Sequence, residues 1–456
     1  MIARDNVNGK LIKAILGIAL PVLVLLIACI SFSDNIPYMD SWELVPLWDK
    51  FYSNQLSFVD LWAQHNEHRL LFPRLIMLGL GYISQWNYLY EIAVNIILGV
   101  SIYGVIAYRL YSIDGFKVRE YVWLYTSISI LAFSLIQQEN WLWGWQMQIF
   151  LNIFAVVGGC FIVSRENFSW IAFSGACIAA IVATYSFANG MLLWIIAGVL
   201  LISMLYQSYL RRSKIAAIIF MWIIIAGSVI TSYLYLYTKP GQHPDLSYAL
   251  YKLHMFVLFI LAYIGSPIAV RAVPAVIVGL GGIVIFVILA KTSLGRVWKK
   301  QISPAQIYPW LGLASYSVLS AGITAIGRAG FGLNQAVVSR YSTIANLFWI
   351  SLIVLYFYSK RYGFEQEDSL IYKWYRAIMH RKRLIGIVLV ITFLWGSGIN
   401  LKNMWNHHKS LSEAKVQIIS GNFEERYLSR VYPIYNIAKV RVSILQKYHL
   451  SLFDKP

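Results

Sequence analysis

Charged residues are scarce in this sequence, where Asp, Glu, Lys and Arg make up 13% of the 456 residues. That share is roughly half of what a soluble globular domain carries. Apolar runs recur along the whole chain, and each is about twenty residues long, enough to cross the hydrocarbon core of a bilayer. A water-soluble fold would have to bury too many Ile, Leu, Val and Phe side chains and is excluded. The sequence predicts an all-α fold, a polytopic transmembrane helical bundle.

Cysteine is equally rare. Cys29, Cys160 and Cys177 all lie inside apolar runs, so we expect buried free thiols and neither a disulfide framework nor a zinc cluster. A Walker-type phosphate loop, the G-x-S-x-G elbow, H-E-x-x-H, C-x-x-C and the dinucleotide fingerprint are missing from the sequence. These absences argue against an ATP-driven pump. The sequence therefore predicts no particular cofactor, although binding of a divalent cation is still an open alternative.

The net charge of +18 does not indicate a nucleic-acid partner. Lys and Arg cluster in short runs between the apolar spans, as the orientation rule for membrane helices expects. The basic charge therefore reports membrane topology and contact with anionic membrane lipids.

Charge placement also favours one topology. Two apolar segments, 69–86 and 250–266, are ambiguous. If neither crosses the membrane, the basic run 209–214 lies on the cytoplasmic side with most of the other Lys and Arg; if both cross, it falls outside, against the rule. We therefore prefer eleven spans with two re-entrant or interfacial helices, and thirteen spans is the alternative. The eleven lie near 12–32, 89–108, 121–137, 147–163, 169–186, 190–206, 215–237, 272–290, 306–326, 342–358 and 384–400.

Both topologies divide the chain in the same way. Residues 1–401 form the transmembrane module, which includes the external stretch 33–68. Residues 402–456 form an external tail of short amphipathic helices with a break at Pro433. The first apolar run is a full span without an evident cleavage site, so we interpret it as the first helix rather than a signal peptide.

The external stretch after the first span concentrates ionisable residues. It holds six of the chain's twenty carboxylates: Asp34, Asp40, Glu43, Asp49, Asp60 and Glu67. A carboxylate held at a membrane surface among Trp and Tyr is partly desolvated, which raises its basicity, and it can act as a general base toward a sugar hydroxyl. Asp40 is the preferred candidate, with Glu43 or Asp34 assisting. The alternative for each is an ordinary capping or interfacial acid.

The end of the same stretch combines histidines with arginines. Arg69 and Arg74 at the mouth of an apolar segment suit a phosphate, which Arg binds in a bidentate manner; snorkelling to lipid headgroups is the alternative. His65 and His68 are weak candidates for a metal site, because their spacing matches no known motif. Further ligand contacts are expected from Asn66, Glu67 and His68.

Two later segments have a similar character. Segment 139–146 is rich in Trp and amides, and we expect Glu139, Asn140, Trp143 and Gln146 to shape a sugar site, although an aromatic belt at a helix end is the alternative. In segment 327–342, Arg328 and Arg340 flank a glycine-bearing loop and, with Tyr341, are candidates for binding a lipid-linked phosphate; contact with lipid headgroups is the alternative.

The preferred topology places five unusual polar segments on one side of the membrane. Charges near the membrane core are costly and tend to mark a site or a pathway. We therefore expect a shared cavity formed by YMDSWE (38–43), QHNEHR (64–69), QQENWLWGWQMQ (137–148), YSFANG (185–190) and GRAGFGLNQAVVSRYS (327–342).

With these segments placed, the chain resembles the GT-C superfamily, polytopic glycosyltransferases that use polyprenyl-phosphate-linked sugars outside the cytoplasm. The shared mark is an acidic residue or pair just after the first span, a position that Asp34, Asp40 and Glu43 match, followed by interfacial helices, which 44–68 would supply. The nearest subgroup is the bacterial serotype-converting O-antigen glucosyltransferases, which have a long first external loop and an external C-terminal tail. The chain lacks the large soluble C-terminal domain of the oligosaccharyltransferases, which disfavours a peptide acceptor.

This resemblance implies an inverting transfer in the bacterial inner membrane, with the loop carboxylate as base and the active site facing the periplasm. Donor and acceptor would be a polyprenyl-phosphate sugar and an O-antigen or other cell-surface glycan or lipid-linked acceptor. Metal use varies across the superfamily. The alternative function is a transporter or flippase of lipid-linked glycans, which should place polar groups deep in several spans and show two pseudo-symmetric halves. A polymerase or ligase of the same pathway would be expected to carry its main loop late in the chain.

Overall fold

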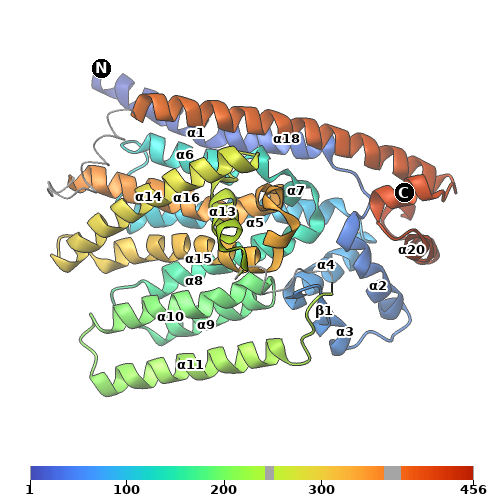
Figure 1. Ribbon diagram of the computed structural model, residues 1–456, viewed down its shortest axis with the longest axis horizontal. Helices are drawn as coiled ribbons and strands as arrows, with labels where there is room; N and C mark the ends of the chain where they lie inside the picture. Colours follow the sequence, from blue (N-terminus) through green and yellow to red (C-terminus); the bar gives the residue numbers. More distant parts are fainter. Residues whose placement is uncertain (1, 242–250, 364–381, 455–456) are drawn as a thin grey trace.

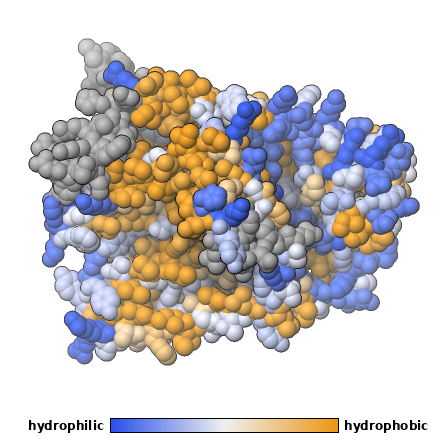
Figure 2. Space-filling model, viewed as in Figure 1, coloured by the Kyte–Doolittle hydropathy of each residue, from blue (hydrophilic) through white to orange (hydrophobic). Residues whose placement is uncertain are grey.

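The structure is a computed structural model that describes residues 2–241, 251–363 and 382–454. Within these residues, nine helices are long and apolar enough to cross a membrane. They lie roughly side by side (Figure 1) and expose broad apolar surfaces (Figure 2), which confirms an all-α, multi-pass membrane protein in contact with lipid. The nine spans contain α1 (Ile2–Phe32), α5 (Leu89–Ser112), α8 (Met147–Val163), α10 (Leu192–Leu205), α11 (Arg212–Leu234), α14 (Ala272–Trp298), α15 (Pro304–Arg328), α16 (Ser342–Tyr362) and α18 (Lys382–Ile419).

Four apolar segments of the described chain form helices shorter than these spans. The ambiguous segments form α4 (Leu71–Ser84) and α13 (Leu253–Gly265), of 14 and 13 residues. At 1.5 Å per residue each is about 20 Å long, less than the roughly 30 Å of a hydrocarbon core, which fits helices that do not cross. However, α6 (Val122–Ala132) and α9 (Trp170–Thr184) have 11 and 15 residues and are shorter than the predicted spans 121–137 and 169–186.

The early end of α6 has a local cause. The Gln137 side-chain amide donates to the carbonyls of Leu131 and Ala132 at 3.0 and 3.1 Å. These are among the last carbonyls of the helix, which have no partner within it. The chain then forms a 3₁₀ turn, η2 (Leu135–Gln137), capped by the Ser134 hydroxyl, and the short helix α7 (Gln138–Leu142). A polar side chain inside the apolar run therefore ends the helix.

The stretch after α1 folds into a small layer at one end of the bundle. It contains η1 (Met39–Leu44), α2 (Val45–Tyr52), α3 (Phe58–Trp62) and a hairpin of β1 (Gln64–His65) and β2 (His68–Arg69). Asn66 occupies the hairpin turn with a φ of 49°, a left-handed conformation that Asn tolerates better than most residues. Trp42 and Trp48 from this layer are fully buried.

The C-terminal segment completes this layer. Figure 1 shows α18 running beside α1 and continuing beyond it toward α20. The predicted module boundary at residue 402 therefore falls inside a continuous helix. Leu411, Ala414 and Ile418 recur on one face of α18 and are buried in a second apolar core, separate from that of the bundle, which explains why the helix continues.

Two short helices follow α18. These are α19 (Glu425–Val431) and α20 (Tyr435–Tyr448). They are separated at Pro433, where a residue without a backbone N–H cannot continue a helix, so the predicted break is confirmed.

Candidate functional site

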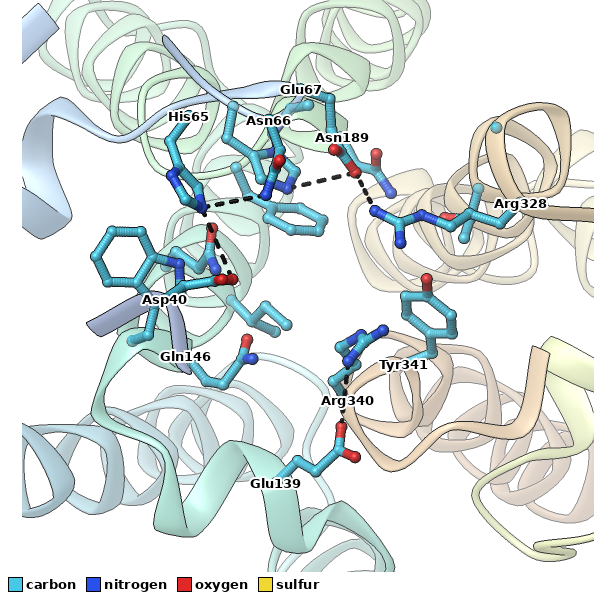
Figure 3. A pocket seen from close by; sticks show the side chains of 18 of the residues that line it. Asp40, His65, Asn66, Glu67, Glu139, Gln146, Asn189, Arg328, Arg340 and Tyr341 are labelled. Atoms are coloured by element: carbon cyan, nitrogen blue, oxygen red, sulfur yellow. Dashed lines mark hydrogen bonds and ion pairs between the residues drawn. The ribbon is translucent and has the colours of Figure 1, made fainter. Parts of the chain in front are cut away.

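A polar cavity of about 820 Å³ lies where this layer meets the bundle. All five polar segments expected on one side of the membrane contribute to it, and Figure 3 shows their side chains converging from different elements. Its polar lining includes Tyr38, Asp40, His65, Asn66, Glu67, His68, Gln138, Glu139, Trp143, Gln146, Gln148, Asn189, Arg328, Arg340 and Tyr341.

Asp40 reaches the cavity from η1. Its side chain is 40% exposed, and its contact among the described residues is with His65, whose Nε2 lies 3.7 Å from the carboxylate Oδ2. Figure 3 places Asp40 across the cavity from Arg328 and Tyr341. The preceding residue, Met39, has a φ of 45°, a conformation that is costly for a side chain with a Cβ and is typically retained around functional sites.

The other two acidic candidates do not line the cavity. The Asp34 carboxylate oxygen Oδ2 lies 2.7 Å from His408 Nδ1. Glu43 accepts two hydrogen bonds from Arg441, each of 2.8 Å, and one of 2.6 Å from Tyr432. Burial alone would raise the pKa of Glu43, but these bonds outweigh it and lower the pKa. The prediction that Asp34 and Glu43 assist catalysis is therefore not supported, because both carboxylates bind the C-terminal segment.

Glu67 and Arg328 form an ion pair on the opposite wall, with 2.8 Å between Oε1 and Nη2. Burial would raise the pKa of Glu67, but His68 and Arg328 dominate and lower it to about 2. Burial lowers the pKa of His68 to about 4, so this ring is neutral at pH 7. The backbone N–H of Ala188 donates to His68 Nδ1 at 3.1 Å, which leaves the ring proton on Nε2, 3.7 Å from Glu67.

A second arginine, Arg340, also lines the cavity. Arg340 is 3.7 Å from Glu139 and stacks over the Tyr341 ring at 5.6 Å. Asn140 does not line the cavity. It is fully buried and donates to the Arg340 carbonyl at 2.9 Å, so it positions the arginine backbone instead of binding a ligand.

Arg69 and Arg74 do not reach the cavity either. The Arg69 guanidinium donates to the backbone carbonyls of Tyr233, at 2.6 Å, Tyr235 and Trp62. Arg74 donates to the Leu61 carbonyl at 3.0 Å and to the Ala63 carbonyl. Most nitrogens of the two guanidinium groups thus donate to backbone carbonyls, and neither arginine lines the cavity, which corrects the expectation that they bind phosphate.

Several buried polar atoms at the cavity lack a hydrogen-bond partner among the described residues. They are Trp143 Nε1, Gln146 Oε1, Gln148 Oε1 and Asn189 Nδ2, and their residues are between 2% and 8% exposed. A buried polar atom left without a partner costs about 1–3 kcal/mol. Such an array of donors and acceptors is therefore suited to a ligand rich in hydroxyl groups.

A resident divalent cation does not fit the two candidate histidines. His68 Nδ1 is engaged by backbone, and His65 Nε2 lies 3.1 Å from Asn66 Nδ2. In the described part of the chain, no three His, Cys, Asp or Glu side chains gather as a metal site would require.

Sequence reasoning missed the contribution of α18 to the cavity. Asn403 and His407 line it, although both fall in the segment predicted to be a tail. Their spacing of four residues, one helical turn, is the signal that marks them as neighbours on one face. Lys239, Tyr233 and Tyr237, from the end of α11 and the loop after it, were also missed.

Comparison with known proteins gives no match to a family model, to a curated protein or to a solved structure. The class defined by fold and site is a multi-pass membrane protein with a polar, carboxylate- and arginine-lined cavity at one end of its helical bundle.

Proposed function

We propose that this protein is a glycosyltransferase of the GT-C type. It moves a sugar from a polyprenyl-phosphate-linked donor to an O-antigen or other cell-surface glycan or lipid-linked acceptor, on the periplasmic side of a bacterial inner membrane. One observation carries the proposal: Asp40 lines the cavity with no Lys or Arg of the described residues within ion-pair distance, while Arg328 lies across the cavity and Arg340 is near enough to interact with it electrostatically.

The chemistry follows from this opposition of charges. Asp40 removes the proton from an acceptor hydroxyl while the oxygen attacks the anomeric carbon of the donor sugar. The bond from that carbon to the phosphate oxygen breaks, and the polyprenyl phosphate leaves with the bonding electrons. Base and leaving group lie on opposite sides of the sugar in such a single displacement, so the configuration at the anomeric carbon inverts.

The arginines would act on the leaving group. Arg328 and Arg340 are held by Glu67 and Glu139, so their positions are fixed before the phosphate arrives. Fixed positive groups stabilise the charge that develops on the departing phosphate without reorganisation cost. The buried amides of Gln146 and Asn189 would bind the sugar hydroxyls.

Reconstitution tests the proposal against the transporter alternative. The purified protein in liposomes receives a polyprenyl-phosphate sugar labelled in the sugar, together with a delipidated O-polysaccharide. We expect label in the polysaccharide. Movement of the labelled donor across the bilayer without transfer would instead establish a flippase and reject the enzyme.

A further inference from the structure

The aromatic side of the cavity has a function that the transfer reaction alone does not assign. Asn403 and His407 project from one face of α18 into the cavity. The neighbouring residues fix the rotation of this helix, because His408 pairs with Asp34 at 2.7 Å and Trp405 packs edge-on against Phe32 at 6.1 Å. The face that carries Asn403 and His407 is therefore held toward the cavity.

These residues join an aromatic wall formed by Trp143, Tyr38 and His407. The His407 ring lies edge-on to Tyr38 with 4.5 Å between centroids, and Tyr38 lies edge-on to Trp143 at 5.6 Å. Trp143 is 8% exposed, and its indole N–H has no acceptor among the described residues. The wall thus combines apolar ring surfaces with donors at their edges, a pairing that suits the C–H faces and hydroxyl groups of a sugar.

The wall lies between Asp40 and Arg340, because Tyr38 interacts electrostatically with Glu139, Arg340 and Asp40. Tyr38 is two residues from Asp40, whereas Arg328 and Tyr341 lie opposite (Figure 3). A lipid phosphate held at Arg328 would leave the wall free for the acceptor whose hydroxyl Asp40 deprotonates. An acceptor must approach Asp40 from its own side of the donor sugar, and the aromatic wall is the surface it meets.

We propose that the aromatic wall, together with Asn403, is the acceptor subsite and binds a sugar unit of the acceptor glycan. This inference rests on the proposed function and assigns to α18 the choice of acceptor. It predicts that changes in Asn403 and His407 alter the use of the acceptor and leave the use of the donor intact.

The test compares two variants of the full-length protein in liposomes. Asn403→Ala with His407→Ala removes both polar groups, and Asn406→Ala is the matched control, because Asn406 is an exposed α18 neighbour outside the cavity lining. We expect the KM for delipidated O-polysaccharide to rise about tenfold in the double variant, as for the loss of one or two hydrogen bonds. The KM for the donor should stay unchanged. A parallel rise in the donor KM, or no change in the acceptor KM, would overturn the assignment.

Binding without turnover separates this assignment from the enzyme proposal. Delipidated O-polysaccharide is titrated against protein carrying Asp40→Asn, with and without the α18 changes, and tryptophan fluorescence reports binding. The expected result is binding that weakens about tenfold in the double variant and persists with Asn406→Ala. If binding is unchanged by the Asn403 and His407 substitutions, or if no binding occurs, the acceptor subsite is rejected even when sugar transfer is observed. If binding depends on these α18 residues but no transfer occurs, the enzyme proposal is rejected and the subsite is retained.

Loss of fold is excluded by a conservative variant. His407→Phe keeps a ring against Tyr38 and removes the polar nitrogens. If acceptor KM rises in this variant at an unchanged melting temperature, the polar contact is responsible; if it stays at the wild-type value while Asn403→Ala also has no effect, the wall is only a packing surface and the proposal fails.

Discussion

Two regions of this molecule use carboxylates from the same short stretch in opposite ways. At the interface between the loop and the C-terminal segment, Glu43 is saturated by Arg441 and Tyr432. In the cavity, Asp40 lies three residues away and keeps 40% of its side chain exposed. The comparison teaches that a carboxylate cannot be identified as a catalytic acid merely because it follows the first helix. The partners supplied by the rest of the chain decide which carboxylate stays available for chemistry.

Asp40→Asn should give the largest effect on the cavity side of this comparison. The amide cannot accept the proton of the attacking hydroxyl, so we expect sugar transfer to fall by about 10²–10⁴-fold. The melting temperature should be unchanged because the side chain is not part of a core. Asp49→Asn is the control: Asp49 contacts Tyr448 at 2.9 Å in the interface, and its loss should leave transfer near wild type. Full activity of Asp40→Asn at normal expression would remove Asp40 from the role of base.

Arg328→Gln should have the next largest effect. It removes one of the positive groups that would face the leaving phosphate in the proposed reaction and breaks the 2.8 Å contact with Glu67. We expect kcat to fall on the order of 10²-fold, as for loss of one fixed donor to a developing negative charge. Arg328→Lys should recover only part of the rate, because an ammonium group cannot reproduce the planar guanidinium contacts. Equal rates for the wild type and Arg328→Gln would contradict the assignment.

Glu43→Gln tests the interface side. The change breaks a bidentate contact in which the Glu43 and Arg441 side chains are 28% and 10% exposed. We expect a loss of about 1–3 kcal/mol in unfolding free energy, read as a lower melting temperature in detergent. The folded fraction should keep most of its transfer activity. A variant that is as stable as the wild type but inactive would move Glu43 into the catalytic machinery.

The same pair predicts a pH dependence. The folded-state pKa of Glu43 lies below its ordinary value of 4.5. A lowered pKa contributes stability that is fully present above the ordinary value and disappears as the pH falls through the folded value. The melting-temperature difference between the wild type and Glu43→Gln should therefore stay constant from about pH 8 to pH 5.5 and shrink below pH 4.5. A difference that grows on acidification would show that the pair is not what stabilises the interface.

The smallest effect is expected from Lys447→Ala. Its ammonium group is 3.3 Å from Asp49, but the two side chains are 61% and 43% exposed, and ion pairs of this kind contribute little in water. The melting temperature should not change measurably. A clear drop would mean that this edge of the interface is shielded from solvent in the membrane-bound protein.

The sequence predicts the helical bundle well because each long apolar run by itself indicates a membrane-spanning helix. The gathering of five polar segments was also predictable, since scarce charges and a topology rule suffice to place them together. The helix ends were harder: α6 stops early because the Gln137 amide binds its last carbonyls, a side-chain contact that hydropathy does not register.

The roles of individual charged residues depend on partners that only the fold reveals. Asp34 and Glu43 meet groups that are 374 and 398 positions away. The Arg69 guanidinium donates hydrogen bonds to backbone carbonyls. No pattern of residues in the sequence indicates these contacts. Asn403 and His407 were hidden because the segment after residue 401 was interpreted as a tail, although their helical spacing was visible.

The large sequence separation of Glu43 and Arg441 has a consequence for biogenesis. The ribosome makes the loop that carries Asp40 long before Arg441, which follows Glu43 by 398 positions, and also before His407. Among the described helices, α1 to α16 are therefore made before the loop can meet these partners. The cavity is completed only when α18 and the segment after it have joined the loop.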